Sequence, residues 1–505
     1  MIRFGPKRSH PLIIFNNFFK NFGLLIALLA FCIFTGDFSN LYNNLMLPVI
    51  VLVGPVTRLF NFLFTRYTID DEKLFIEKGL LNRQKIELPL NTITSVDFSQ
   101  SLIFQIARVY MVNVENSASL RGNQTKVQFA LKSDSALEAK TFLLGKQNDG
   151  KSQTDEDGLP IGDANVQDQT ILSRRAASIG EILLLGLLQA KALVIFQVLS
   201  VVTVIITFGS QLFLKENING DQYLLGWFIN LKGIQVILIA VLVLYAAGII
   251  VSLFMSSLKY FGFCVTNRSD SIFVEYGLLT RKTHTIMKNK ISGVNYKQPF
   301  LMKPFNMGVL YVFVAGFSLE EDNAPKDAML FPLLRRHELQ PFLERHIPGI
   351  TAQPEYRRPE KKAVPYFFLC PRFIFSVIFL AACILIGYFQ DAPAAPIIAF
   401  GEYLWMVGLA VFVFTICSVL LECRHTGIYS GNENVSLTYG GYTKNEVTLL
   451  TSKVESIREH ASLSKKAKNI TSVLVSIIAA PTYANHHVRN ISLTDFRQME
   501  SVLKY

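Results

Sequence analysis

Residues 74–83 of this chain read LFIEKGLLNR, and residues 272–281 read IFVEYGLLTR. The match extends further along the chain, because an isoleucine, Ile93 or Ile291, follows each glycine by 14 residues. A glutamine, Gln100 or Gln298, then follows each isoleucine by seven. Self-similarity at a constant spacing is the signature of a repeated structural unit. The chain of 505 residues is therefore predicted to contain one folding unit at least twice.

A third, divergent copy lies near the C-terminus. Residues 435–440 read VSLTYG, and Val454 stands 14 residues after Gly440, where the other copies have isoleucine. The Leu-Leu-x-Arg turn is replaced by Gly-Tyr-Thr-Lys at residues 441–444. We predict three modules, and this departure weakens the case that the third shares a ligand site with the others.

Each module is predicted to be rich in β-strands. Residues 74–77, 84–88, 110–114 and 126–130 of the first copy have the composition and alternation of strands. The glycine supplies the positive φ that a tight turn between two strands needs. A helix is predicted to end each module, at residues 135–144, 334–346 and 492–503. The modules are thus predicted to be α+β, with a small β-barrel or sandwich closed by one helix.

Long stretches without charge predict membrane spans between the modules. Half of the residues are hydrophobic and the mean hydropathy is +0.34. A helix that crosses the hydrocarbon core needs roughly 20 apolar residues with few charges. Six such spans in three hairpins are expected, at residues 21–36, 46–64, 192–214, 233–258, 373–390 and 403–421.

The distribution of basic residues predicts the orientation. The hairpin loops at residues 36–44, 210–230 and 389–396 contain only one basic residue, Lys215, whereas the chain has 49. Basic residues near span ends stay in the cytoplasm, so the modules and both termini are expected there. The net charge of +11 then suits an anionic inner leaflet. Nucleic acid is the weaker alternative for this charge, and we predict no nucleic-acid partner.

These patterns divide the chain into eight segments. Transmembrane hairpins are assigned to residues 1–65, 176–258 and 365–422, and modules to residues 66–148, 259–349 and 423–505. A polar linker is assigned to residues 149–175 and a basic linker to residues 350–364.

The repeated turn, the isoleucine after it, the bulky loop and the alternation with paired apolar segments resemble the bacterial PH-like membrane proteins of the YdbS/YdbT type. Three copies in about 500 residues resemble the YdbT form. The resemblance implies PH-like β-barrels or sandwiches, each capped by a C-terminal helix, in a multi-pass protein of the bacterial cytoplasmic membrane. It implies no established catalytic activity.

Two basic pairs follow the strand turns, Arg83 with Lys85 and Arg281 with Lys282. In PH-like folds this position often holds phosphate head groups, which is an argument from fold analogy. The alternative is ordinary surface charge, and the third copy offers only Lys444.

Apolar residues cluster in the loops after Gln100 and Gln298. The residues singled out are Leu102, Phe104, Phe300 and Met302. Exposed bulky runs are uncommon unless they meet lipid or protein. These loops are expected either to enter the membrane interface or to pack inside the barrel or against a neighbouring module.

A basic cluster precedes the fifth span. Arg357, Arg358, Lys361 and Lys362 are placed to hold anionic head groups. The alternative is that they only enforce topology.

Catalysis has no positive support in the sequence. The cysteines form no CxxC pair, the only histidine pair is the adjacent His486 and His487, and the common hydrolase, metalloprotease and nucleotide motifs are absent. We therefore predict no enzyme activity, no cofactor and no metal site. Ionisable residues do not recur at equivalent depth in the hairpins, as they would in a coupled transporter.

The leading hypothesis is a membrane scaffold whose modules bind anionic lipid or a protein partner and link the state of the envelope to a response. The resemblance suggests a smaller protein with the same module as a partner, and assembly with a second copy of the chain is the alternative. The rival is a transporter or lipid-moving protein gated by the modules.

Overall fold

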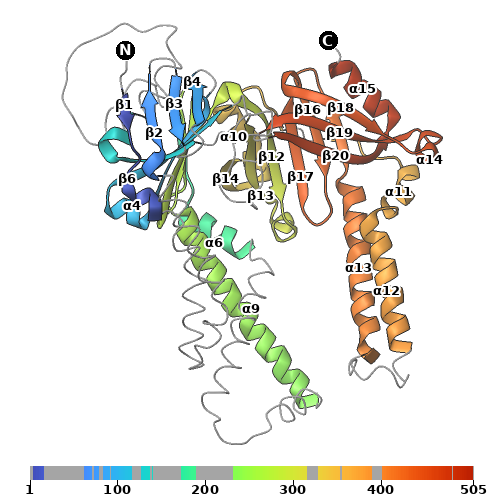
Figure 1. The fold of residues 1–505 in the computed structure, drawn as a ribbon. Helices are drawn as coiled ribbons and strands as arrows, with labels where there is room; N and C mark the ends of the chain where they lie inside the picture. Colours follow the sequence, from blue (N-terminus) through green and yellow to red (C-terminus); the bar gives the residue numbers. More distant parts are fainter. Residues whose placement is uncertain are drawn as a thin grey trace, which may run out of the picture.

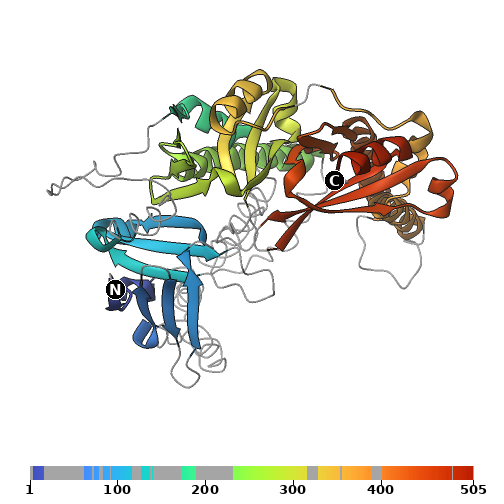
Figure 2. The ribbon, with the colours of Figure 1, turned by 90° about the horizontal axis from the view of Figure 1, so that it is seen from above.

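The computed structural model describes residues 4–15, 62–70, 73–78, 84–90, 93–116, 127–136, 139, 172–188, 231–314, 328–352, 355–388, 401–479 and 482–503. Three β-rich modules stand in a row, and long apolar helices extend from one side of it (Figure 1). We call this the helix side. Seen from above, the modules follow one another in chain order (Figure 2).

The second module shows the plan of the repeat. Its first four strands are β8 (Ser173–Ala176), β9 (Cys264–Asn267), β10 (Ser271–Tyr276) and β11 (Thr280–Met287). After the short η4 (Lys288–Lys290), three more strands follow, β12 (Ile291–Gln298), β13 (Met307–Val314) and β14 (Ala328–Arg335). The loop η5 (Phe300–Phe305) joins β12 to β13, and α10 (Arg336–His346) ends the module.

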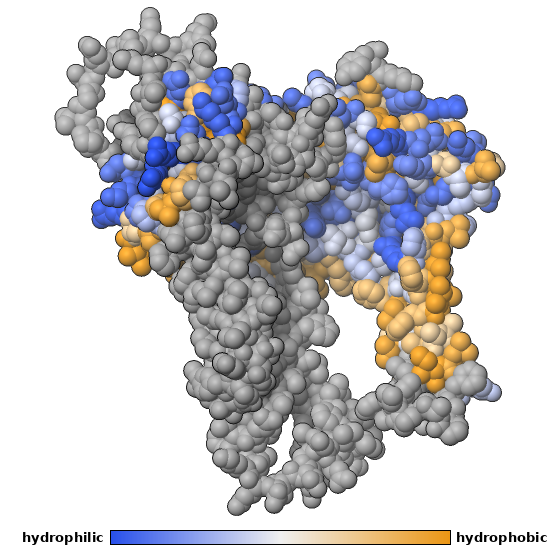
Figure 3. Space-filling view, viewed as in Figure 1, coloured by the Kyte–Doolittle hydropathy of each residue, from blue (hydrophilic) through white to orange (hydrophobic). Residues whose placement is uncertain are grey.

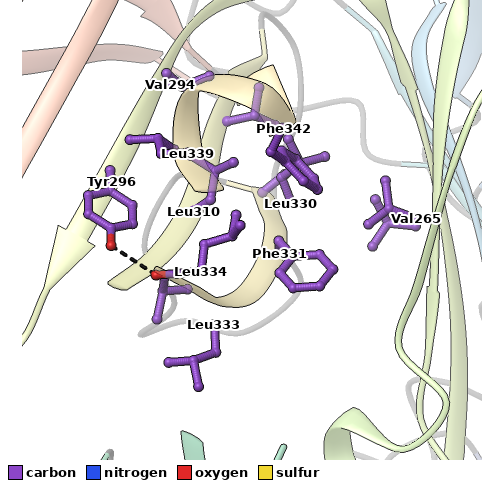
Figure 4. Packing of buried hydrophobic residues seen from close by; sticks show 14 of the residues in the cluster. Val265, Val294, Tyr296, Leu310, Leu330, Phe331, Leu333, Leu334, Leu339 and Phe342 are labelled. Atoms are coloured by element: carbon purple, nitrogen blue, oxygen red, sulfur yellow. Dashed lines mark hydrogen bonds between the residues drawn. The ribbon is translucent and has the colours of Figure 1, made fainter. Parts of the chain in front are cut away.

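The core of this module lies between its two sets of strands and α10. Val265, Leu330, Phe331 and Phe342 are at most 2% exposed and face one another in Figure 4. The hydroxyl of Tyr296 donates a 2.9 Å hydrogen bond to the Leu334 carbonyl, so the one polar group of this buried ring is satisfied.

The other modules repeat this order of strands, and the helix predicted to end the first module at residues 135–144 lies mostly outside the described residues. In the first, β1 (Phe4–Lys7), β2 (Arg66–Ile69), β3 (Lys73–Lys78) and β4 (Gln84–Pro89) precede β5 (Ile93–Ser101), α4 (Leu102–Ile106), β6 (Val109–Asn116) and β7 (Val127–Lys132). In the third, β15 (Gly427–Ser430), β16 (Asn434–Tyr439) and β17 (Lys444–Leu450) precede β18 (Val454–His460), α14 (Leu463–Lys466), β19 (Ile470–Ala479), β20 (Thr482–Ser492) and α15 (Leu493–Leu503). The mixed α+β plan with antiparallel strands is confirmed.

The modules share their sheets, which the sequence prediction of separate units did not include. Among the described residues, β7-β6-β5 continues into β11-β10-β9-β8, and β14-β13-β12 continues into β17-β16-β15. We call the β5·β11 and β12·β17 pairings the first and second seam. Strand edges present unpaired N–H and C=O groups, and these pairings satisfy them.

The module boundaries also differ from the prediction. Strands β1 and β8 come from segments assigned to a hairpin and a linker, because each pairs with the strand that follows the next apolar segment, β2 or β9. In the third module a single bridge, Arg357 to Ile428, occupies the same place.

The turn glycines have the predicted conformation. Gly277 has φ of +104° and Gly440 has φ of +110°. A Cβ at either position would lie 2.1 Å from a carbonyl oxygen, that of Thr280 or Thr443. Only glycine fits these turns. Gly79 lies outside the described residues.

Helices cover three of the six predicted spans. They are α9 (Leu231–Tyr260), α12 (Pro371–Tyr388) and α13 (Gly401–His425). In the described part of the chain, Trp405–His425 is long and apolar enough to cross a membrane, and a second span is counted if Lys361–Phe368 and Pro371–Ile386, bent by 53°, form one. The predicted spans 21–36 and 192–214, and all but the end of 46–64, lie outside the described residues. The number of six spans therefore stays a prediction.

Candidate functional site

An apolar surface runs along the helix side of the first two modules. It is formed by exposed side chains of α4, of the turn between β10 and β11, and of η5. We call it the apolar rim and define it as Leu102, Ile103, Ile106, Leu278, Leu279, Phe300, Leu301 and Phe305. Figure 3 shows hydrophobic surface on the helix side of the modules and along the α12–α13 pair. Exposed apolar surfaces of this kind are typical of sites that meet lipid or protein.

Each loop of the rim sends one side chain inward and others outward. Phe104 is 3% exposed and Met302 0%, whereas Leu102 is 49% exposed and Phe300 54%. Of the four loop residues singled out from the sequence, two therefore pack inside their modules and two are exposed. The buried member fixes the loop on its own module and the exposed member faces outward.

The loops leave their modules through a repeated backbone feature. Arg108, Asn306 and Asn469, which precede β6, β13 and β19, all have a φ between 50° and 57°. Asparagine tolerates this left-handed conformation better than most residues, and arginine less so. The left-handed residue at the end of this loop thus recurs in all three modules, although the third loop has few apolar residues.

The loops also contact the next module at its glycine turn. Gln105 Nε2 donates to the carbonyls of Leu278, at 3.3 Å, and Leu279, at 3.2 Å. At the second seam, Lys303 Nζ donates to the Gly441 carbonyl at 2.9 Å. Gln105 and Lys303 both lie 26 residues after the turn glycine of their module. The same position of the repeat therefore supplies the side chain that donates a hydrogen bond across each seam.

The glycine turns rest on the apolar helices. The N–H of Gly277 donates to the Phe261 carbonyl at 2.8 Å, and that of Leu278 donates to the Leu258 carbonyl, in α9, at 3.0 Å. In the third module, Tyr442 stacks on Phe414 of α13 at 4.3 Å and donates to its carbonyl at 2.7 Å. Loop, turn and helix thus form one continuous set of contacts at each seam.

Charged side chains lie within both seams. In the first, His284 Nδ1 is 3.1 Å from Asp97 Oδ1, and its Nε2 is 3.1 Å from the Tyr276 hydroxyl. In the second, the buried carboxylate of Glu446 contacts Arg336 and, at 2.5 Å, Lys444. Burial, followed by the nearby charge of Lys444, lowers the pKa of Lys303 to about 8.

A further ionic contact joins the third module to its hairpin. Glu422 near the end of α13 contacts Arg372 at the start of α12, and Arg489 of β20 lies 3.5 Å from the same carboxylate group. Glu422 is buried. A movement of this helix pair would therefore change a contact with the third module directly.

The basic residues predicted after the turns have different surroundings. Arg281 is exposed and faces Gln100 in the first seam, and Lys282 is half-buried and faces Ser99. Lys85 is exposed on β4, with its Nζ 5.1 Å from the centre of the Phe75 ring. Arg83 lies outside the described residues. The pairs thus do not form one common pocket in the described structure.

The members of the basic cluster before the fifth span also differ in their surroundings. Arg357 contacts Asp495, at 3.2 Å, and Gln498, so it ties this segment to α15. Arg358 and Lys361 are exposed, and Lys362 lies 4.0 Å from Glu360. Arg358, Lys361 and Lys362 are the members whose side chains are available to an anionic surface.

Some site residues escaped the sequence analysis. Leu278 and Leu279 were read only as part of a turn, although a leucine pair at a tight turn, where polar residues are usual, was a usable signal. The contacts of His284 and Glu446 across the seams could not be read from spacing, because they join different modules. Among the described residues, no group of three or more metal-ligating side chains is placed to hold an ion.

Comparison with known proteins agrees with this repeat. The Bacterial PH domain family model matches residues 22–146 and 222–346. UPF0699 transmembrane protein YdbT of Bacillus subtilis (strain 168) is 21% identical over 417 residues, which cover 77% of this chain and 82% of that protein. No solved structure matches. Two matches to the Bacterial PH domain model thus cover the first two predicted repeats, and the chain is similar over most of its length to a transmembrane protein.

Proposed function

We propose that the chain is a non-enzymatic scaffold of the bacterial cytoplasmic membrane, whose three modules lie against the inner leaflet and bind anionic lipid or protein partners. Through the contacts between modules and helices, this binding would link the state of the envelope to a cytoplasmic response. The observation that carries the proposal is the apolar rim, which lies on the side from which the long apolar helices leave the modules.

The rim has the composition of an interfacial surface. Leucine, isoleucine and phenylalanine side chains are exposed there, and Arg281 lies beside them in the sequence and structure. Apolar side chains that enter the boundary between head groups and acyl chains, next to cations that reach the head groups, stabilise binding to anionic membranes. The helices would hold the modules at this depth, and the rim would determine which face meets the leaflet.

The depth of the rim can be measured directly. In a full-length background carrying Trp227→Phe and Trp405→Phe, Phe300→Trp places one indole in the rim. Arg497→Trp places one at an exposed position of α15, on the far side of the modules in Figure 1. In bilayers with brominated acyl chains, strong quenching is expected for the first variant and little for the second. Bilayers of phosphatidylcholine and of phosphatidylglycerol distinguish a general from an anionic-lipid contact.

Two results would count against the proposal. Equal quenching at both positions would show that the rim does not face the bilayer. Turnover of a lipid or nucleotide substrate that one point substitution abolishes would overturn the non-enzymatic assignment.

A further inference from the structure

The two seams within the chain use one register. Arg281 faces Gln100 in the first seam and Lys444 faces Gln298 in the second. In both pairs, one residue lies four positions after its turn glycine and the other lies 21 positions after the turn glycine of the preceding module. The seam is therefore a property of the repeat, and the same two edges recur in every module.

One copy of each edge is left over at the ends of the row. Strand β18 is the counterpart of β5 and β12, and β4 is the counterpart of β11 and β17. Among the described residues, β18 pairs only with β19, and β4 pairs only with β3. None of the seven residues of β18 is buried, whereas seven of the eight in β12 are. Both leftover edges lie on the same molecule, and their counterparts pair with each other in the two internal seams.

We propose that β18 of one copy pairs antiparallel with β4 of a second copy, in the register of the internal seams, so that the chain assembles head to tail. This names a partner for the proposed scaffold, but it does not depend on the contact of the rim with lipid. A head-to-tail contact builds a ring if its rotation closes and a filament if it does not. Because α9 and the α12–α13 pair leave the modules on one side, repeating the step keeps the helices on one side (Figure 1).

One pair of side chains across the proposed seam has opposite charges. In the second seam, Tyr296 faces Glu446. Tyr296 lies 19 positions after Gly277, and Glu446 lies six positions after Gly440. The same positions at the leftover edges are Glu459 and Lys85. Opposite charges directly across an antiparallel pair attract, and like charges destabilise. Pro89 lies just beyond the paired stretch, so its missing N–H does not interrupt the ladder.

The loop of the third module points to the same partner. Lys466 occupies the position of Gln105 and Lys303, which close the two internal seams, and it is exposed on α14. Leu463 on the same short helix is 89% exposed. Both residues would be covered by the glycine turn of a following module, as their counterparts are at the seams.

A charge exchange tests the proposal. Lys85→Glu alone and Glu459→Lys alone each place like charges across every seam between identical copies. Each is expected to weaken self-association of the full chain in detergent micelles by about tenfold, measured by mass photometry over a concentration series. An equimolar mixture of the two variants, or the double variant, restores opposite charges at every seam and should associate like the wild type.

The register has its own control. In a cysteine-free background, Glu459→Cys with Lys85→Cys should form an intermolecular disulfide. Arg458→Cys with Lys85→Cys should not, because adjacent residues of a strand point to opposite faces. Tm values of the single charge variants equal to that of the wild type show that the modules remain folded.

The possible outcomes separate cleanly. Association that is lost in each variant and restored in the mixture establishes the seam. A wild-type chain that stays monomeric at all concentrations, association that neither substitution changes, or a different PH-domain protein bound to β18 of a monomeric chain overturns it. Quenching at Phe300→Trp is expected to be unchanged in these variants, so failure of this inference is distinguishable from failure of the proposed function.

Discussion

Strands β12 and β18 occupy the same position of the repeat but have different surroundings. β12 lies between two strands and carries one charged residue, Lys297, in the sequence ISGVNYKQ. β18 has one strand neighbour among the described residues and reads VESIREH, with three charged residues and a histidine. Charged edges suppress indiscriminate strand pairing. The comparison indicates that charged side chains at the edge of the row discourage indiscriminate strand pairing, and the proposed seam would pair one of these charges with its opposite.

The largest expected effect on stability is that of Gly293→Val in β12. A Cβ at Gly293 would lie 2.5 Å from the Thr448 carbonyl oxygen and 2.8 Å from Leu449 Cδ2, across the second seam. Overpacking of this kind should destabilise the seam by about 3 kcal/mol. Faster hydrogen exchange in β12 and β17 would report it. The control, Ser456→Val, lies at the same repeat position in β18 and should change exchange little.

The second prediction concerns pH. Burial lowers the pKa of His486 to about 4, where its ring lies 4.8 Å from Phe313 of the second module and its Nδ1 is 2.9 Å from the Tyr439 hydroxyl. The unfolded chain binds this proton near pH 6.5, so stability that is present above pH 6.5 is lost as the pH falls towards 4.

The stability lost through His486 is about 2 to 3 kcal/mol between pH 6.5 and pH 4. The Tm of the wild type should fall more steeply between pH 6.5 and 4 than that of His486→Gln. Its exposed neighbour provides the comparison. Burial, followed by the nearby charge of Arg489, also lowers the pKa of His487, but this side chain is exposed, so His487→Gln should flatten the pH dependence less than His486→Gln. Parallel curves for all three proteins would refute the assignment.

The third prediction removes the buried charge of the second seam. Glu446→Ala leaves Arg336 and Lys444 without their carboxylate, and both are partly exposed, so a loss of about 2 kcal/mol is expected, less than for a fully buried pair. Glu455→Ala, on exposed β18, should change the free energy of unfolding by less than about 0.5 kcal/mol. Equal Tm shifts for the two variants would mean that the seam carries no special stability.

The smallest effect on stability is expected for the side chains that donate hydrogen bonds across the seams. Gln105→Ala removes the hydrogen bonds to the Leu278 and Leu279 carbonyls, with a cost of about 1 kcal/mol. Lys466→Ala at the same repeat position should leave the Tm of the isolated chain unchanged, yet weaken its self-association. A stability loss for Lys466→Ala at high dilution would contradict its role between copies.

The sequence predicted the modules well but their arrangement poorly. The glycine turns, the strands around them and the helices α10 and α15 follow from local patterns, and the structure confirms them. The apolar loops were singled out from the sequence, but whether Leu102 faces outward and Phe104 inward depends on packing. Arg357 was a candidate for lipid contact, and its contact with Asp495 involves a residue 138 positions away.

The sequence by itself determined that one unit recurs, that glycine must stand at each turn, and that apolar segments alternate with β-rich modules. These properties depend on spacing, on the allowed φ of one residue and on local hydropathy. Only the tertiary structure decided that the modules share sheets, and therefore that β4 and β18 are left at the ends of the row. Backbone N–H and C=O groups are alike in every strand, so which edges meet is decided by how the modules are placed in space.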